Sequence, residues 1–162
     1  MRHLPSYFLS LLLFACHGLY AQPTDKDQPI QLAADSVDVD EGTGISLYQG
    51  NVDLRQGNMQ MLADKVRIKY QGRQPKKIFA YGKPVHFTQK TDEGLVAAQA
   101  LRAEYIVNSD FLTLIDKASV TKNGDTMNSD RITYDRVHHK IKAGAAASGK
   151  QRVQITIQPP KK

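Results

Sequence analysis

The chain has 162 residues, 22 Lys and Arg against 16 Asp and Glu, and a formal net charge of +6. This length is enough for one domain with a sizeable apolar core. Its single cysteine, Cys16, excludes a scaffold held together by disulfides.

The N-terminus has the organisation of a secretory signal peptide. Arg2 precedes a short apolar stretch from Leu4 to Ala15, and Ala21 stands just before a polar segment. A membrane-spanning helix needs roughly 20 apolar residues, so this stretch is too short to span a bilayer. We predict a signal peptide over residues 1–21, removed on export, and a flexible segment over residues 22–28.

A second interpretation of the same region concerns Cys16. The segment from Leu13 to Cys16 resembles a lipoprotein box, in which the cysteine is lipidated. The large Phe14 fits that pattern poorly, and Ala21 offers an ordinary cleavage site. Removal of the signal peptide would leave a mature chain without cysteine.

Residues 29–158 have the pattern of one all-β domain, followed by a short tail at 159–162. Val66, Ile68 and Tyr70 alternate with basic residues, which is the period of a strand with one buried face. Similar alternation recurs along the domain, and no long stretch has helical spacing. We therefore expect an almost entirely β structure.

Turn residues separate these runs at short intervals and predict an antiparallel meander. They are residues 41–44, 56–58, 71–73, 92–94, 108–110 and 122–125. Because no helix is available to cover the apolar face, the sheet must fold onto a second sheet or onto itself. We predict a jelly roll or a rolled, open-sided sandwich.

Two sequence cassettes alternate along the chain with a common period near 33 residues, which indicates stacked repeats. The first is a small residue followed by a strand pattern and begins at Ala34, Ala63, Ala98 and Ser129. The second is interpreted as a turn followed by a strand and begins at Gly50, Gly82, Asp116 and Gly149. Asp116 departs from the glycine of the other copies. A sheet built from repeats has unpaired end strands, which favours head-to-tail association.

The charge indicates an anionic partner. Without residues 1–21 the chain has a net charge of about +5, which suits nucleic acid, a phosphorylated glycolipid or an anionic membrane. Export argues against nucleic acid and leaves an anionic envelope lipid. Even spacing of the Lys and Arg residues is equally compatible with a solvated strand face.

The sequence predicts no catalytic, cofactor or metal site. Beyond the signal peptide the histidines are His86, His138 and His139, and no nucleophile elbow, phosphate loop or zinc spacing accompanies them. His138 and His139 are adjacent, so on a strand they would point to opposite faces. We predict that the protein is not an enzyme.

Apolar residues predicted to face inward form either a packed core or a ligand groove, and their pattern alone does not separate the two. The inward candidates are Ile30, Leu32, Met59, Met61, Phe87, Tyr105 and Val107. Small inward residues and the two methionines favour room for flexible chains.

Several segments together resemble the LptA/OstA-like family of periplasmic lipopolysaccharide export proteins. They are DQPIQL at 27–32, YQGNV at 48–52, ADKV at 63–66, YGKPVHF at 81–87, SDFLTL at 109–114 and the final GKQRVQITI. The resemblance implies a rolled jelly roll of about sixteen antiparallel strands with an open apolar groove. It also implies transfer of lipopolysaccharide from the inner to the outer membrane.

The resemblance further implies where partners bind. Lipid A chains would lie in the groove, where the inward residues named above would bind them, and copies would stack head to tail. An LptC-like inner-membrane partner would meet the N-terminal edge at Ile30 and Leu32. An LptD-like outer-membrane partner would meet the C-terminal edge at Val153, Ile155 and Ile157. The alternatives are an assembly module that carries no lipid and a tether lipidated at Cys16.

Overall fold

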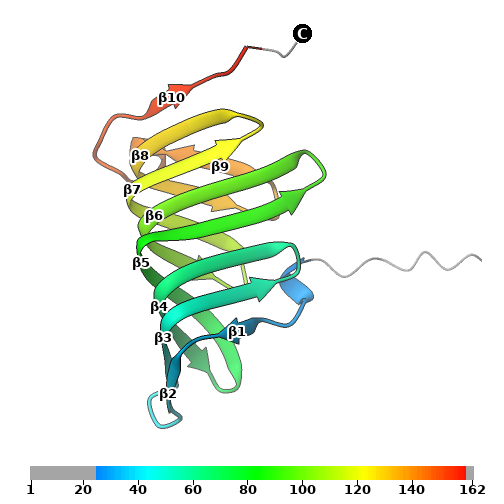
Figure 1. Ribbon diagram of the computed structural model, residues 1–162, viewed down its shortest axis with the longest axis vertical. Coiled ribbons are helices and arrows are strands. Elements are labelled where there is room, and N and C mark those ends of the chain that lie inside the picture. Colours follow the sequence, from blue (N-terminus) through cyan, green and yellow to red (C-terminus); the bar gives the residue numbers. More distant parts are fainter. Residues whose placement is uncertain (1–24, 160–162) are drawn as a thin grey trace, which may run out of the picture.

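The computed structural model describes residues 25–159, which fold into one antiparallel sheet that curls into a roll (Figure 1). The strands are β1 (Gln31–Ala33), β2 (Ser36–Asp40), β3 (Ile45–Gln56), β4 (Met59–Gln71), β5 (Gln74–Thr91), β6 (Gly94–Ile106), β7 (Phe111–Lys122), β8 (Asp125–Asp135), β9 (Lys140–Ala143) and β10 (Gln154–Thr156). Two short 3-10 turns, η1 (Asp25–Asp27) and η2 (Gly144–Ala147), complete the described elements. Among them no helix is long and apolar enough to cross a membrane.

The all-β prediction is confirmed, and the alternation behind it is visible in β4. Val66 and Ile68 are buried there, whereas Lys65 and Lys69 are exposed. Consecutive strand residues face opposite sides of the sheet, so one side of β4 belongs to the core. Each of the six predicted turn segments lies at the junction of two successive strands from β2 to β8.

A line of bulges bends the six long strands, β3 to β8. Each adjacent pair has a register shift along this line, between Gln49 and Val52 in β3 and near residues 62–65, 81–85, 99–102 and 115–118 in the later strands. The pair β4 and β5 has a second shift, between Lys69 and Tyr70, near its hairpin. A bulge bends its strand and increases the local twist. Successive bulges therefore form a seam along which the sheet folds over.

The seam divides the sheet into two walls. The first wall contains β1, β10 and the strand halves that meet at the hairpins 56–59, 91–94 and 122–125. The second wall contains β2, β9 and the halves that meet at the hairpins 71–74, 106–111 and 135–140. The hairpin ends of both walls lie opposite the seam, and we call that side the open side.

Two expectations are corrected by this arrangement. The expected count of about sixteen strands is wrong, because the described chain forms ten, and six of them run through both walls. The second cassette does not close hairpins, since Gly50, Gly82 and Asp116 lie inside β3, β5 and β7 near the seam. Asp116 adopts the left-handed conformation of Gly50, with φ of 65° against 79°. Bulge geometry therefore tolerates the aspartate at this position.

The core lies between the walls and consists of rows of side chains from paired strands. One row of the first wall contains Leu32, Leu54, Met61, Phe87, Ala98, Val120, Met127 and Ile155. Paired residues share a face of the sheet, so such a row runs the length of the molecule. The Phe87 ring meets the Tyr134 ring of the second wall edge to face, with centroids 6.3 Å apart. Direct contact between the walls therefore fills the middle of the roll.

Close packing at the seam predicts that Gly50→Ala destabilises the protein more than Gly72→Ala. Both glycines have positive φ, which costs an alanine about 1 kcal/mol. A Cβ at Gly50 would lie 2.2 Å from Asp35 Oδ2, whereas nothing lies within 4 Å at Gly72. We expect an extra loss of about 1–2 kcal/mol in the free energy of unfolding for Gly50→Ala, measured by urea denaturation. Equal losses would contradict a tight seam.

Candidate functional site

The roll is hollow at its N-terminal end, where β1 faces the second wall. A cavity of about 450 Å³ is lined by Gln28, Pro29, Ile30, Leu32, Tyr48, Gln56, Ile68, Tyr70, Pro75 and Val107. A second hollow of about 500 Å³ lies on the other side of Tyr48 and Tyr70, toward β2. The structure thus brings three predicted lipid-binding residues, Ile30, Leu32 and Val107, to one apolar mouth.

The other four predicted lipid-binding residues lie deeper in the roll. Met59, Met61, Phe87 and Tyr105 are each 1% exposed and belong to the main apolar core. They line none of the cavities described above, so the interior around them is filled by protein side chains.

Apolar side chains remain uncovered at both ends of the rows. At the C-terminal end Ile155 and Ile157 are 56% and 74% exposed, and Val153 is half-buried. At the N-terminal end Val37 and Val39 of β2 are 57% and 58% exposed, although their pairing with Tyr48 and Ser46 places them on the inner face. The segments of β2 and β10 therefore present core-type residues without a neighbouring strand to cover them.

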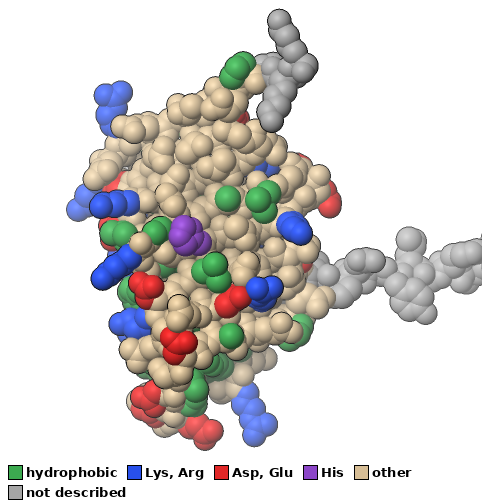
Figure 2. Space-filling view, in the orientation of Figure 1, with side chains coloured by type: hydrophobic (Ala, Val, Ile, Leu, Met, Phe, Trp, Pro, Cys, Tyr) green, Lys and Arg blue, Asp and Glu red, His purple; other side chains and the backbone are tan. Residues whose placement is uncertain are grey.

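The outward faces of the end strands of the second wall carry opposite charges. Asp38 and Asp40 alternate with the valines of β2, and Lys140 and Lys142 alternate with Ile141 in β9. Acidic side chains gather at the lower end of Figure 2, where β2 lies. The two ends of this wall are thus complementary in both charge and apolar pattern.

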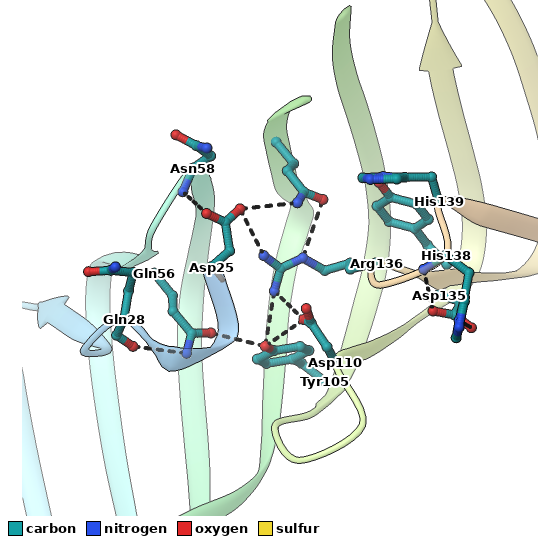
Figure 3. Close-up of polar contacts among 12 residues, drawn as sticks. Asp25, Gln28, Gln56, Asn58, Tyr105, Asp110, Asp135, Arg136, His138 and His139 are labelled. Carbon is teal, nitrogen blue, oxygen red and sulfur yellow. Dashed lines mark hydrogen bonds and ion pairs between the residues drawn. The ribbon is translucent and has the colours of Figure 1, made fainter. Parts of the chain in front are cut away.

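A buried polar cluster crosses the open side of the roll (Figure 3). Arg136 follows β8 and is 2% exposed. Its Nη1 donates to Asp110 Oδ1 at 2.5 Å and to the Tyr105 hydroxyl at 2.9 Å. Burial raises the pKa of the Tyr105 phenol, so its hydroxyl stays protonated and can donate to a neighbouring acceptor. These three residues belong to the second wall.

Contacts from this cluster reach the first wall at two points. Gln56 Oε1 lies 2.9 Å from the Tyr105 hydroxyl, and Gln89 Oε1 accepts from Arg136 Nε at 3.3 Å. Because Gln56 and Gln89 lie at the hairpin ends of the first wall, these bonds hold the walls together opposite the seam. Gln56 also lines the apolar cavity, so the cluster and the cavity are adjacent.

The cluster also holds the segment before β1. Asp25 Oδ2 in η1 lies 3.7 Å from Arg136 Nη2 and accepts from Gln89 Nε2 at 3.3 Å. Its Oδ1 accepts from the backbone N–H of Asn58, and Gln56 Nε2 donates to the Gln28 carbonyl at 3.1 Å. Asp25 and Gln28 thus connect this segment to the first wall.

Sequence reasoning missed this cluster. Its members come from five separate parts of the chain and share no motif. Arg136 lies in a turn beside His138, where a solvated cation is the ordinary expectation. Only the bend at the seam brings its hairpin near Gln56 and Gln89.

The histidines form local contacts. His138 Nδ1 lies 2.8 Å from Asp135 Oδ2, and hydrogen bonding by His138 lowers the pKa of the Asp135 carboxyl. The His139 ring lies 3.3 Å from the Tyr134 hydroxyl. Within residues 25–159 no group of three or more His, Cys, Asp or Glu residues is placed to hold a metal ion. Residues 1–24, with Cys16 and the predicted cleavage site, lie outside the described residues.

Comparison with known proteins identifies relatives over most of the chain. Residues 31–140 match the family described as LptA/(LptD N-terminal domain) LPS transport protein. The chain is 32% identical to lipopolysaccharide export system protein LptH of Pseudomonas aeruginosa over 150 residues, which cover 88% of this chain and 86% of that protein. It is 33% identical to lipopolysaccharide export system protein LptA of Escherichia coli K12 over 137 residues, covering 83% and 74% respectively.

Comparison of the fold with solved structures identifies a relative of the same kind. The crystal structure of LptH from Pseudomonas aeruginosa, described as the LptA-homologous periplasmic component of the lipopolysaccharide transport device, superimposes with a TM-score of 0.76. The match has 30% identity and covers 85% of this chain and all of that one. A matching family domain, relatives above 30% identity and a shared fold together show that the chain belongs to the LptA/(LptD N-terminal domain) family of lipopolysaccharide transport proteins.

Proposed function

We propose that this protein binds lipopolysaccharide in the periplasm and forms part of a bridge that moves it from the inner to the outer membrane. The observation that carries this proposal is the continuous apolar interior, which opens into a cavity at one end and stays uncovered at both. The family confirms that the chain is not an enzyme, because its relatives are transport proteins.

An enclosed apolar path would lower the free-energy cost of moving acyl chains between the membranes. Each buried methylene is worth roughly 0.8 kcal/mol, so several acyl chains crossing water would cost tens of kcal/mol. The interior of the roll offers those chains a low-dielectric route. Sugars and phosphates of the same lipid would remain outside, at the open side.

The interior must widen to accept a whole lipid. A cavity of about 450 Å³ lies within the usual range for one small ligand, and the residues beyond it are packed. The seam joins the walls through continuous strands, whereas the open side joins them through side chains. Separation of the walls at the open side therefore requires the least disruption of the sheet.

The uncovered end strands support the proposed partners. In this proposal an LptC-like partner pairs with the N-terminal edge, which includes Ile30 and Leu32, and an LptD-like partner pairs with the C-terminal edge, which includes Val153, Ile155 and Ile157. Further copies of the chain stack head to tail between them. Each added partner would cover the end of the apolar rows and extend the interior.

The pairing registers suggest how two copies join in the second wall. If the rows continue without a shift, β9 of one copy lies antiparallel to β2 of the next. Ala143 and Ile141 then face Val37 and Val39 on the inside. On the outside Lys142 and Lys140 face Asp38 and Asp40.

Lipid carriage predicts a face-specific cross-link. A photo-reactive residue at Leu32 should form an adduct with lipopolysaccharide in cells, because this side chain lines the cavity. The same residue at Leu62 should form none, because Leu62 is 42% exposed and its neighbour Met61 occupies the inner face. The adducts are detected as lipopolysaccharide-positive bands on a denaturing gel. Absence of an adduct at Leu32, with full bridging of partners, would identify an assembly module instead.

The proposed junction predicts salt-sensitive self-association. The dissociation constant for self-association of the double variant Lys140→Glu, Lys142→Glu should rise about tenfold, since two attractive cross-strand pairs become repulsive. Sedimentation velocity at low ionic strength measures the change. Lys65→Glu with Lys77→Glu, which reverses two exposed charges within the second wall, is the matched control.

Restoration by the complementary change completes this test. Adding the glutamate variant to a copy with Asp38→Lys and Asp40→Lys should recover association, because the new pairs attract in the same register. If the swapped copies stay apart while the wild type associates, another pair of edges forms the junction.

A further inference from the structure

The positive charge of Arg136 lies in an unusual position, because it is buried. Its side chain is fully buried and lies where the two walls meet at the open side of the roll. A buried guanidinium is costly unless it is paired and all its N–H groups are bonded. Asp110 supplies the pairing, at 2.5 Å from Nη1.

One edge of this guanidinium is incompletely satisfied. Nη2 is buried and donates no hydrogen bond within residues 25–159. Its countercharge, Asp25 Oδ2, lies 3.7 Å away, beyond hydrogen-bond distance. The adjoining Nε donates only to the neutral Gln89, at 3.3 Å. The edge formed by Nε and Nη2 thus faces an anionic group without binding it closely.

The anionic group at this edge belongs to a short segment rather than to a strand. Asp25 lies in η1, a single 3-10 turn outside the sheet, and its side chain is 23% exposed. Figure 3 shows this carboxylate between Asn58 and Arg136, and its Oδ2 also accepts from Gln89 Nε2. Departure of η1 would expose the Nε and Nη2 edge without breaking any strand pairing.

We propose that Arg136 is a binding site for a phosphate group of the transported lipid, which takes the place of the Asp25 carboxylate. This inference rests on the proposed lipid-carrier function and names a residue that meets the lipid headgroup. Guanidinium presents paired donors that match phosphate oxygens, and such charge-assisted bonds are stronger than neutral ones. Asp110 stays on Nη1 and keeps the arginine in place.

The position of the site fits an amphiphile. Gln56 contacts the cluster through Tyr105 on one side and lines the apolar cavity on the other. A phosphate at Arg136 would therefore leave the attached acyl chains beside Ile30, Leu32 and the interior. Exchange of carboxylate for phosphate also removes contacts that join η1 to the hairpin ends, which loosens the open side as the lipid enters.

The test compares binding of phosphorylated lipid A and its dephosphorylated form to purified wild type and to the Asp25→Asn variant. The variant removes the competing charge, so its affinity for phosphorylated lipid A should rise about two- to fivefold. Its affinity for the dephosphorylated form should not change. Asp92→Asn, which removes the same charge from an exposed turn, should leave both affinities as in the wild type.

Arg136→Gln provides the converse measurement. It should lower the affinity for phosphorylated lipid A at least about tenfold and abolish the preference over the dephosphorylated form. Urea denaturation shows whether Arg136→Gln is folded. If it is unfolded, the Asp25→Asn variant alone tests the phosphate site. Equal binding of both lipids by wild type, or no response to Asp25→Asn, would overturn the phosphate site and leave lipid carriage standing. Binding of neither lipid would overturn the carrier function as well.

Discussion

The structure depends on one constraint, which is that a single sheet must cover its own apolar face. No α-helix packs on the described sheet, so the six long strands bend at a line of bulges and bring their inner faces together. Every other feature follows from this bend. It places Phe87 against Tyr134, leaves hairpin ends opposite the seam, and packs rows of side chains into a core that opens into a cavity at the N-terminal end.

Folding in this way creates two unequal sides. The seam is held by covalent chain and ladder hydrogen bonds, whereas the open side depends on Arg136 and the polar groups around it. Polar clusters of this kind are costly when only partly satisfied, so their loss on binding can be offset by new partners. In the proposed carrier the seam would be the firm side, and the open side would part to admit the lipid.

Much of the fold could be predicted from residues alone. The alternation around Val66 and the turn segments such as 71–73 specify strands and hairpins through local preferences. The bend could not be recognised, because a glycine such as Gly50 inside a strand and a glycine in a turn look alike in sequence. The count of about sixteen strands came from the family resemblance, and it exceeds the ten described because six strands run through both walls. The cluster at Arg136 was beyond reach, since only the bend joins residues 25, 56, 89 and 136.

The number of strand segments in each wall is even, and this bears on the length of an assembly of copies. Each wall contains two short strands and halves of the six long ones, so its last strand runs opposite to its first and the alternation of direction can continue into another copy unchanged. Such an interface joins different surfaces of identical molecules and does not close on itself. Assembly of this kind has no built-in end point. The gap between the two membranes, rather than the protein, would then decide how many copies are used.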